Sequence, residues 1–151
     1  MQLSKHLSLA EVTRSESAKR NGVSNMPTPE HLENFKLLAE KVFEPIREHF
    51  GVPIHISSGY RSKELNKAIG GSSSSQHLLG QAIDIDMDGS SSGVTNKQVF
   101  DFIIKNLDFD QAINEFNYSW VHVSYNSKGK QRKQVLDAIK VGGKTTYVPH
   151  K

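Results

Sequence analysis

The apolar and polar positions predict helices in the first third of the chain and mainly strands after it. Ser8 followed by Glu11 forms a capping-box pattern, which predicts a helix over residues 9–20. Gly22 follows as a stop signal, because glycine readily adopts the left-handed conformation that ends many helices.

The longest helical pattern begins at Thr28, a preferred N-cap residue, with Pro29 in the first turn. Apolar residues then recur three or four positions apart as far as Gly51, which predicts one long helix that Pro45 kinks or divides. The apolar stripe consists of Leu32, Phe35, Leu38, Ala39, Val42, Phe43, Ile46 and Phe50.

Alternating apolar and polar residues predict strands in the later part of the chain. The four strand segments are residues 52–60, 81–88, 109–116 and 120–125. The last two read as a hairpin with a tight turn around Tyr118 and Ser119. Helical spacing is seen over residues 61–71 and 95–107, and residues 133–149 fit either a terminal hairpin or, over VLDAI, a helix.

Helices followed by a mostly antiparallel sheet predict an α+β fold, with the N-terminal helices packed on the sheet. The chain has 151 residues, which is enough for one domain with a core of its own. We therefore expect a single domain over residues 1–151, and we expect a monomer.

The charge pattern narrows the choice of partners. The net charge is +3, and the basic residues are spread along the chain, so we expect no specific nucleic-acid site. The densest basic segment, residues 128–133, fits a solvated turn. Residues 1–22 contain no continuous apolar run, so we expect neither a Sec-type signal peptide nor a membrane span.

The chain contains no cysteine, so any bound metal must be held by His, Asp or Glu. Those ligands favour a catalytic zinc or a harder cation over a structural zinc of the thiolate type. The sequence therefore directs attention to clusters of imidazole and carboxylate groups.

One such cluster lies in the pattern S-x-H-x-x-G-x-A-x-D. His77 lies on the loop entering the predicted strand, and Gly80 permits a sharp backbone turn. Asp84 projects from the strand toward His77, while the small Ala82 on the same face leaves room beside a metal. An imidazole and a carboxylate at such a corner can share one metal ion.

The serines around this cluster predict loops that form the mobile rim of a cleft. Ser75 differs from the others because it belongs to the pattern. We expect Ser75 to touch substrate or a ligand residue.

A catalytic zinc commonly takes three protein ligands and leaves one position for water. His122 is the best third ligand, because it lies on a predicted strand of the same sheet with Val121 and Val123 on the opposite, core-facing side. Zinc held in this way would lower the pKa of a water molecule and polarise a carbonyl.

A hydrolase also needs a base. With a two- or four-residue loop centred between Tyr118 and Ser119, Glu115 lies directly opposite His122 on one face. With a three-residue loop, Asn114 takes that place. Glu115 is therefore permitted as the base but not required by the pattern.

Arg61 follows the end of another predicted strand. A guanidinium in that place can hold a substrate carboxylate or a developing oxyanion. Trp120 either packs in the core beside the ligand set or lines the substrate cleft.

Four segments together resemble a known family. They are SGYRS with the later Asn66, SQHLLGQAIDI, FDQAINEF and WVHVSY. Over residues 3–149 the chain resembles the zinc D-Ala-D-Ala carboxypeptidase family, and in particular its compact subgroup from phages and bacteria.

This resemblance implies that His77, Asp84 and His122 are zinc ligands and that Arg61 binds substrate. It also implies the small α+β fold shared by Hedgehog signalling domains and D,D-peptidases. Members cut peptidoglycan stem peptides, either as D,D-carboxypeptidases or as phage endolysins acting at L-Ala–D-Glu. The implied partner is thus a peptidoglycan stem peptide, and the implied setting is a host cell wall.

The chain departs from the family pattern at Ser119, where many relatives carry an acidic base three residues before the last histidine ligand. The compact subgroup uses an acid on the preceding strand, which matches Glu115. The alternative is a non-catalytic, metal-containing module of the same fold that binds the cell wall or belongs to a virion.

Three further residues receive weaker expectations. Asp86 fits a surface group or a supporting role beside a ligand. Asp88 fits a turn, and His55 is a minor candidate for the cleft because it alternates with apolar neighbours.

Overall fold

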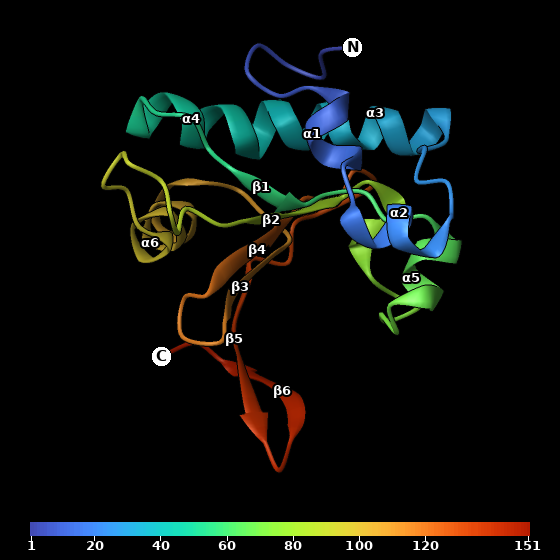
Figure 1. Cartoon of the computed structure of the whole chain (residues 1–151). Helices are drawn as coiled ribbons and strands as arrows, with labels where there is room; N and C mark the ends of the chain where they lie inside the picture. Colours follow the sequence, from blue (N-terminus) through green and yellow to red (C-terminus); the bar gives the residue numbers. More distant parts are fainter.

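The longest helices pack on one face of a twisted six-stranded sheet (Figure 1). The computed structural model covers residues 1–151 and gives the strand order β1-β2-β4-β3-β5-β6. The strands are β1 (Ile56–Ser58), β2 (Ala82–Ile85), β3 (Gln111–Glu115), β4 (Trp120–Ser124), β5 (Gln134–Val141) and β6 (Lys144–Pro149). Only β3 and β5 are parallel neighbours, so the predicted α+β class and mostly antiparallel sheet are confirmed.

The helical segments precede the sheet and also interrupt it. They are α1 (Leu9–Thr13), α2 (Glu16–Asn21), α3 (Pro29–Leu38), η1 (Ala39–Phe43), α4 (Glu44–Phe50), α5 (Lys63–Ala68), η2 (Gln76–Leu79) and α6 (Asn96–Asn106). In Figure 1, α3 and α4 form a rod above the sheet, α6 lies near one end of it, and α2 and α5 lie near the other. None of the helices has the length and apolar character needed to cross a membrane.

The first predicted helix, over residues 9–20, is wrong in one respect, because it is divided in two. Arg14 is extended, with φ −61° and ψ 128°, and Ser15 then caps a new helix by accepting a hydrogen bond from the amide of Ala18. Ser15 thus competes with the helical backbone, as serine side chains commonly do. The capping box at Ser8 and the left-handed stop at Gly22 are confirmed.

The long helix continues through Pro45 by way of a π-helical turn. The amide of Glu44 donates to the carbonyl of Ala39, five residues earlier, and α4 begins at that point with Pro45 in its first turn. A π-turn is one of the ways in which a helix accommodates a proline without breaking. The buried residues of this rod include Phe35, Val42 and Ile46.

The strand predicted over residues 81–88 ends early, at Ile85. Asp86 and Asp88 leave the sheet, because the Asp86 carboxylate accepts hydrogen bonds from the amide of Asp88 and the side chain of Asn96. Both faces of β2 are buried, although its alternating apolar and polar residues are typical of a half-buried strand. Its apolar side chains nevertheless face the helices and leave Asp84 on the other side.

The C-terminal segment is a hairpin, so the helical alternative over VLDAI is wrong. Gly142 and Gly143 both have positive φ, which lets β5 and β6 join through a two-residue turn. Figure 1 shows this hairpin extending away from the helices. It continues the sheet beyond β3. One face of the hairpin borders the polar cluster described next.

Candidate metal centre

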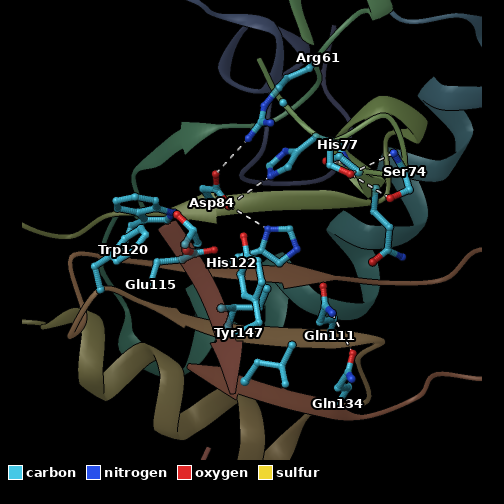
Figure 2. A pocket seen from close by; sticks show the side chains of 18 of the residues that line it. Arg61, Ser74, His77, Asp84, Gln111, Glu115, Trp120, His122, Gln134 and Tyr147 are labelled. Atoms are coloured by element: carbon cyan, nitrogen blue, oxygen red, sulfur yellow. Dashed lines mark hydrogen bonds and ion pairs between the residues drawn. The ribbon is translucent and has the colours of Figure 1, made fainter. Parts of the chain in front are cut away.

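Two neighbouring strands and one short helical turn bring the predicted ligand residues together. Asp84 on β2 lies directly opposite His122 on β4, and η2 brings His77 to the same place. Oδ1 of Asp84 is 3.3 Å from Nε2 of His77 and 3.1 Å from Nδ1 of His122. Figure 2 shows the two imidazoles converging on the carboxylate.

The donor set fits a zinc ion. One ligand atom from each residue lies within 4.8 Å of the others, and all three residues are at most 9% exposed. Zinc bonds of 2.0–2.1 Å in a tetrahedron place ligand atoms about 3.3 Å apart, close to the two separations around Asp84. Two imidazoles and one carboxylate also leave one position for water.

The His77 ring is held by a glycine carbonyl. Nδ1 of His77 donates to the carbonyl of Gly59 at 2.6 Å, so the hydrogen sits on that nitrogen and Nε2 remains available to a metal. Gly59 also packs tightly against Val12, which it can do because it has no side chain. A Cβ at this position would collide with the backbone of Val12.

Gly80 is required for two independent reasons. Its φ is +71°, a conformation that side chains disfavour, and a Cβ would strike the carbonyl oxygen of His31. The chain therefore turns sharply between His77 and Asp84, which confirms the expected corner. The unexpected detail is that His77 lies on the 3₁₀ turn η2 and not on a plain loop.

The Asp84 carboxylate stays ionised despite its burial. Burial alone would raise its pKa, but His77 and His122 outweigh that effect and hold the pKa of Asp84 far below its usual value. Nη2 of Arg61 lies 3.8 Å from Oδ2 of Asp84, whereas both histidines approach Oδ1 (Figure 2). Arg61 is also tied to the centre through its amide, which donates to the carbonyl of His77.

Glu115 lies on the same face as His122, although the predicted register is wrong. His122 is opposite Ile113, and Glu115 is opposite Trp120. The turn comprises residues 116–119 and so begins one residue earlier than the sequence predicts. Glu115 is therefore a diagonal neighbour of His122 and not its direct partner.

A left-handed turn causes this register. Phe116, Asn117 and Tyr118 all have positive φ, between 50° and 63°, although none of them is glycine. The Asn114 side chain supports the turn by accepting a hydrogen bond from the amide of Tyr118 at 2.6 Å. Backbone of this kind in ordinary residues is uncommon and is often found beside functional sites.

The Glu115 carboxylate is 7% exposed and has no hydrogen-bond donor within the protein. Burial, followed by the nearby charge of Asp84, raises the pKa of Glu115 to about 7, although His122 and Arg61 act in the opposite direction. A carboxyl group with this pKa can accept or release a proton near neutral pH.

Comparison with known families now adds to this geometry. A family model described as Peptidase M15 matches residues 5–124. The chain belongs to the peptidase M15 family. No curated protein matches the chain.

Membership indicates a metallopeptidase, and the His77, Asp84 and His122 group is the place in this M15 chain where a metal could bind. The match includes α1 through β4, and so contains all three of these residues together with Glu115 and Arg61. The β5–β6 hairpin lies outside it.

The metal centre opens into a cleft of about 670 Å³. Ser75 lines this cleft, and its hydroxyl accepts a hydrogen bond from the amide of His77, so it touches a ligand residue as expected. Trp120 also lines the cleft, beside Phe116, and does not belong to the buried core. The structure thus places Trp120 at the cleft and not in the core, while its contact with substrate stays a prediction.

Ser119 does not take part in this cleft. Its hydroxyl donates to the carbonyl of Phe116 at 2.8 Å, on the exposed side of the hairpin turn. His55 is exposed, next to Arg14, and lies outside the cleft. Asp86 supports α6 through Asn96 and makes no hydrogen bond to a ligand residue.

No pattern in residues 133–149 predicted that the C-terminal hairpin would line this cleft. Leu136, Thr145 and Tyr147 of this M15 chain form one wall of the cleft. Tyr147 lies opposite Ala138, which in turn lies beside Glu115, so these residues form one row across three strands. The alternation of residues 133–149 could have indicated this wall, had the parallel pairing of β3 and β5 been predicted.

Proposed function

We propose that this chain is a zinc metallopeptidase that hydrolyses a peptide bond in peptidoglycan stem peptides, as a D,D-carboxypeptidase or an endolysin-type endopeptidase. The observation that carries the proposal is the meeting of two features in one cleft. A buried His-Asp-His group lies there beside Glu115, a carboxyl group with a pKa of about 7. Membership of the M15 family supports the same chemistry.

In this proposal His77, Asp84 and His122 hold Zn²⁺. When bound, zinc would supply the positive charge that acidifies water and polarises a peptide carbonyl. The Gly59 carbonyl orients His77, and Arg61 steadies the second oxygen of Asp84. These outer contacts keep the ligand atoms in place before substrate arrives.

Glu115 serves as the general base. It accepts a proton from the attacking water and passes that proton to the amine that leaves when the C–N bond breaks. Its burial supports this role, because a carboxylate without hydrogen-bond donors keeps its basicity. Ser119 would be unsuited to this work, since a hydroxyl is not a base at neutral pH.

Arg61, Ser75 and Trp120 serve the substrate. The Arg61 guanidinium can donate to the oxyanion that forms at the attacked carbonyl, or to a substrate carboxylate. Ser75 and Trp120 both line the cleft, where they can contact the peptide. We further propose that the chain forms one domain with the fold of Hedgehog domains and D,D-peptidases. It would act as a monomer on a bacterial cell wall.

The experiment is a digest of purified muropeptides analysed by mass spectrometry, with and without a chelator. We expect loss of D-alanine or cleavage within the stem, abolished by the chelator and restored by zinc. The mass of the product identifies the bond. Metal binding without any product would contradict the peptidase and favour a non-catalytic cell-wall module, an alternative suggested by Ser119.

A further inference from the structure

A buried carboxylate clamps an arginine at one end of the cleft. Asp110 is 2% exposed and precedes β3. Nε of Arg132 donates to both oxygens of Asp110 at 3.1 Å, and Nη2 donates to Oδ2 at 2.7 Å. The amide of Arg132 adds a fourth contact, at 2.9 Å. An arginine held in this way keeps its guanidinium in one orientation.

The backbone around Arg132 is fixed as firmly as the side chain. Lys133 has φ +54°, and its amide donates to the carbonyl of Phe109. The next amide, from Gln134, donates to the carbonyl of Asp110. Three successive amides thus bind residues 109–110, so this part of the basic segment is not the solvated turn that the sequence predicts.

Arg132 still presents donors to the cleft that it lines. Its side chain is 55% exposed, and Nη1 makes no hydrogen bond within the protein. The internal ion pair with Asp110 uses only the Nε and Nη2 edge. A planar guanidinium with a free edge is suited to a carboxylate, which accepts two parallel hydrogen bonds.

The distance between Arg132 and the candidate metal centre determines which part of a bound peptide Arg132 can contact. Asp110, which holds Arg132, is three residues from Ile113, and Ile113 is the direct partner of His122. Three residues of an extended strand span about 10 Å. Gln76, the neighbour of His77, also donates to Asp110 at 3.0 Å and so connects the two places. An extended peptide bridges about 10 Å with two to three residues.

We propose that Arg132 forms a subsite for a substrate carboxylate that lies two to three residues from the bond that is cut. This inference rests on the proposed function for its substrate, a peptide. It assigns a specificity-determining role to a residue outside the matched family region.

Binding to a chain that does not turn over tests the subsite separately from catalysis. The probes are two stem peptides that differ only in whether the carboxylate at that distance is free or amidated. Their affinities for the zinc-loaded Glu115→Gln protein are measured by calorimetry. A charge-assisted pair contributes about 1.5–3 kcal/mol, so we expect the free carboxylate to bind at least about tenfold tighter.

Three variants in the same background identify the residue. Arg132→Gln should abolish the preference, and Lys130→Gln, which removes an equal charge from an exposed site outside the cleft, should retain it. Arg132→Lys keeps a cation beside Asp110 and hence the fold, but loses the planar edge, so the preference should fall several-fold. Equal binding of both peptides, no binding of either, or a preference that survives Arg132→Gln would overturn the subsite.

Failure of the two proposals can be told apart. An Arg132-dependent preference without cleavage by the unsubstituted chain would support the subsite and contradict the peptidase. Cleavage at equal rates with no Arg132-dependent preference would do the reverse.

Discussion

Glu115 and His122 share one face of the sheet without lying directly opposite each other. Diagonal neighbours on adjacent strands lie about 7–8 Å apart, whereas the Cβ atoms of direct partners are about 5 Å apart. The wider separation leaves room for a water molecule between Glu115 on β3 and His122 on β4. A direct pairing, one of the two registers that the sequence allows, would bring Glu115 close enough to compete for a metal.

The ligand set predicts the effect of removing one of its members. His77→Ala should lose zinc, because only an imidazole and a carboxylate would remain to hold it. We expect metal analysis after dialysis to give about one zinc per chain for the unsubstituted protein and almost none for the variant. His55→Ala, an exposed histidine outside the cleft, is the matched control. Full zinc occupancy in His77→Ala would disprove the ligand assignment.

The two demands on Gly80 can be separated with a second glycine. Gly80→Ala introduces both a strained φ and a collision with the His31 carbonyl, so we expect a loss of at least about 3 kcal/mol in unfolding free energy. Gly89→Ala introduces a similar strain at φ +83° in open space and should cost about 1–2 kcal/mol. Urea denaturation measures both. Equal losses would show that the close approach to His31 has no energetic consequence.

Ionisation of Glu115 should make the metal-free protein less stable as pH rises. The pKa of Glu115 is about 7 in the folded chain and 4.5 as its ordinary value, so folding favours the protonated form. The contribution of Glu115 to stability is therefore greatest below pH 4.5, falls between pH 4.5 and 7, and is constant above pH 7. Because glutamine does not ionise, Glu115→Gln should become more stable relative to the unsubstituted chain as pH rises over this range. The gain in unfolding free energy should reach up to about 3 kcal/mol.

Asp84 acts in the opposite direction, because its lowered pKa contributes stability that is lost in acid. It is present in both proteins, so the comparison largely removes its contribution. Urea titrations with chelator at several pH values measure the difference. A difference that stays flat between pH 5 and 8 would contradict the raised pKa of Glu115.

Asn114 should matter for the turn that positions Glu115. Its side chain accepts from the Tyr118 amide and donates to Asp137 on β5, so Asn114→Ala deprives the half-buried Tyr118 amide of this acceptor and Asp137 of one donor. We expect a loss of about 1–3 kcal/mol in unfolding free energy. Asn106→Ala, an exposed asparagine that bonds only within its own helix, should cost less than about 1 kcal/mol. Similar losses in the two variants would remove Asn114 from the account of the turn.

The sequence predicted that His77, Asp84 and His122 would lie together because their spacing reflects local geometry. His77, Gly80 and Asp84 lie within one corner of the chain, and alternation alone places His122 away from the core-facing valines. Local rules also predicted the caps at Ser8 and Thr28, which depend on residues only three positions apart.

Features that depend on unusual backbone conformations or on distant partners escaped sequence reasoning. The hairpin register was missed because three residues other than glycine adopt positive φ, held partly by Asn114. Arg132 was read as part of a solvated turn because its partner, Asp110, is 22 residues away. The role of the C-terminal hairpin depends on a parallel pairing with β3 that no short motif announces.

The central claim is that Glu115 is the base of a zinc peptidase. The most direct measurement is product release from purified muropeptides by zinc-loaded Glu115→Gln, compared with the unsubstituted chain and with Glu48→Gln as a control outside the cleft. Loss of a general base predicts a rate at least about 100-fold lower at unchanged zinc content, with no change in the control. A Glu115→Gln protein that holds zinc and releases product at the unsubstituted rate would contradict the claim.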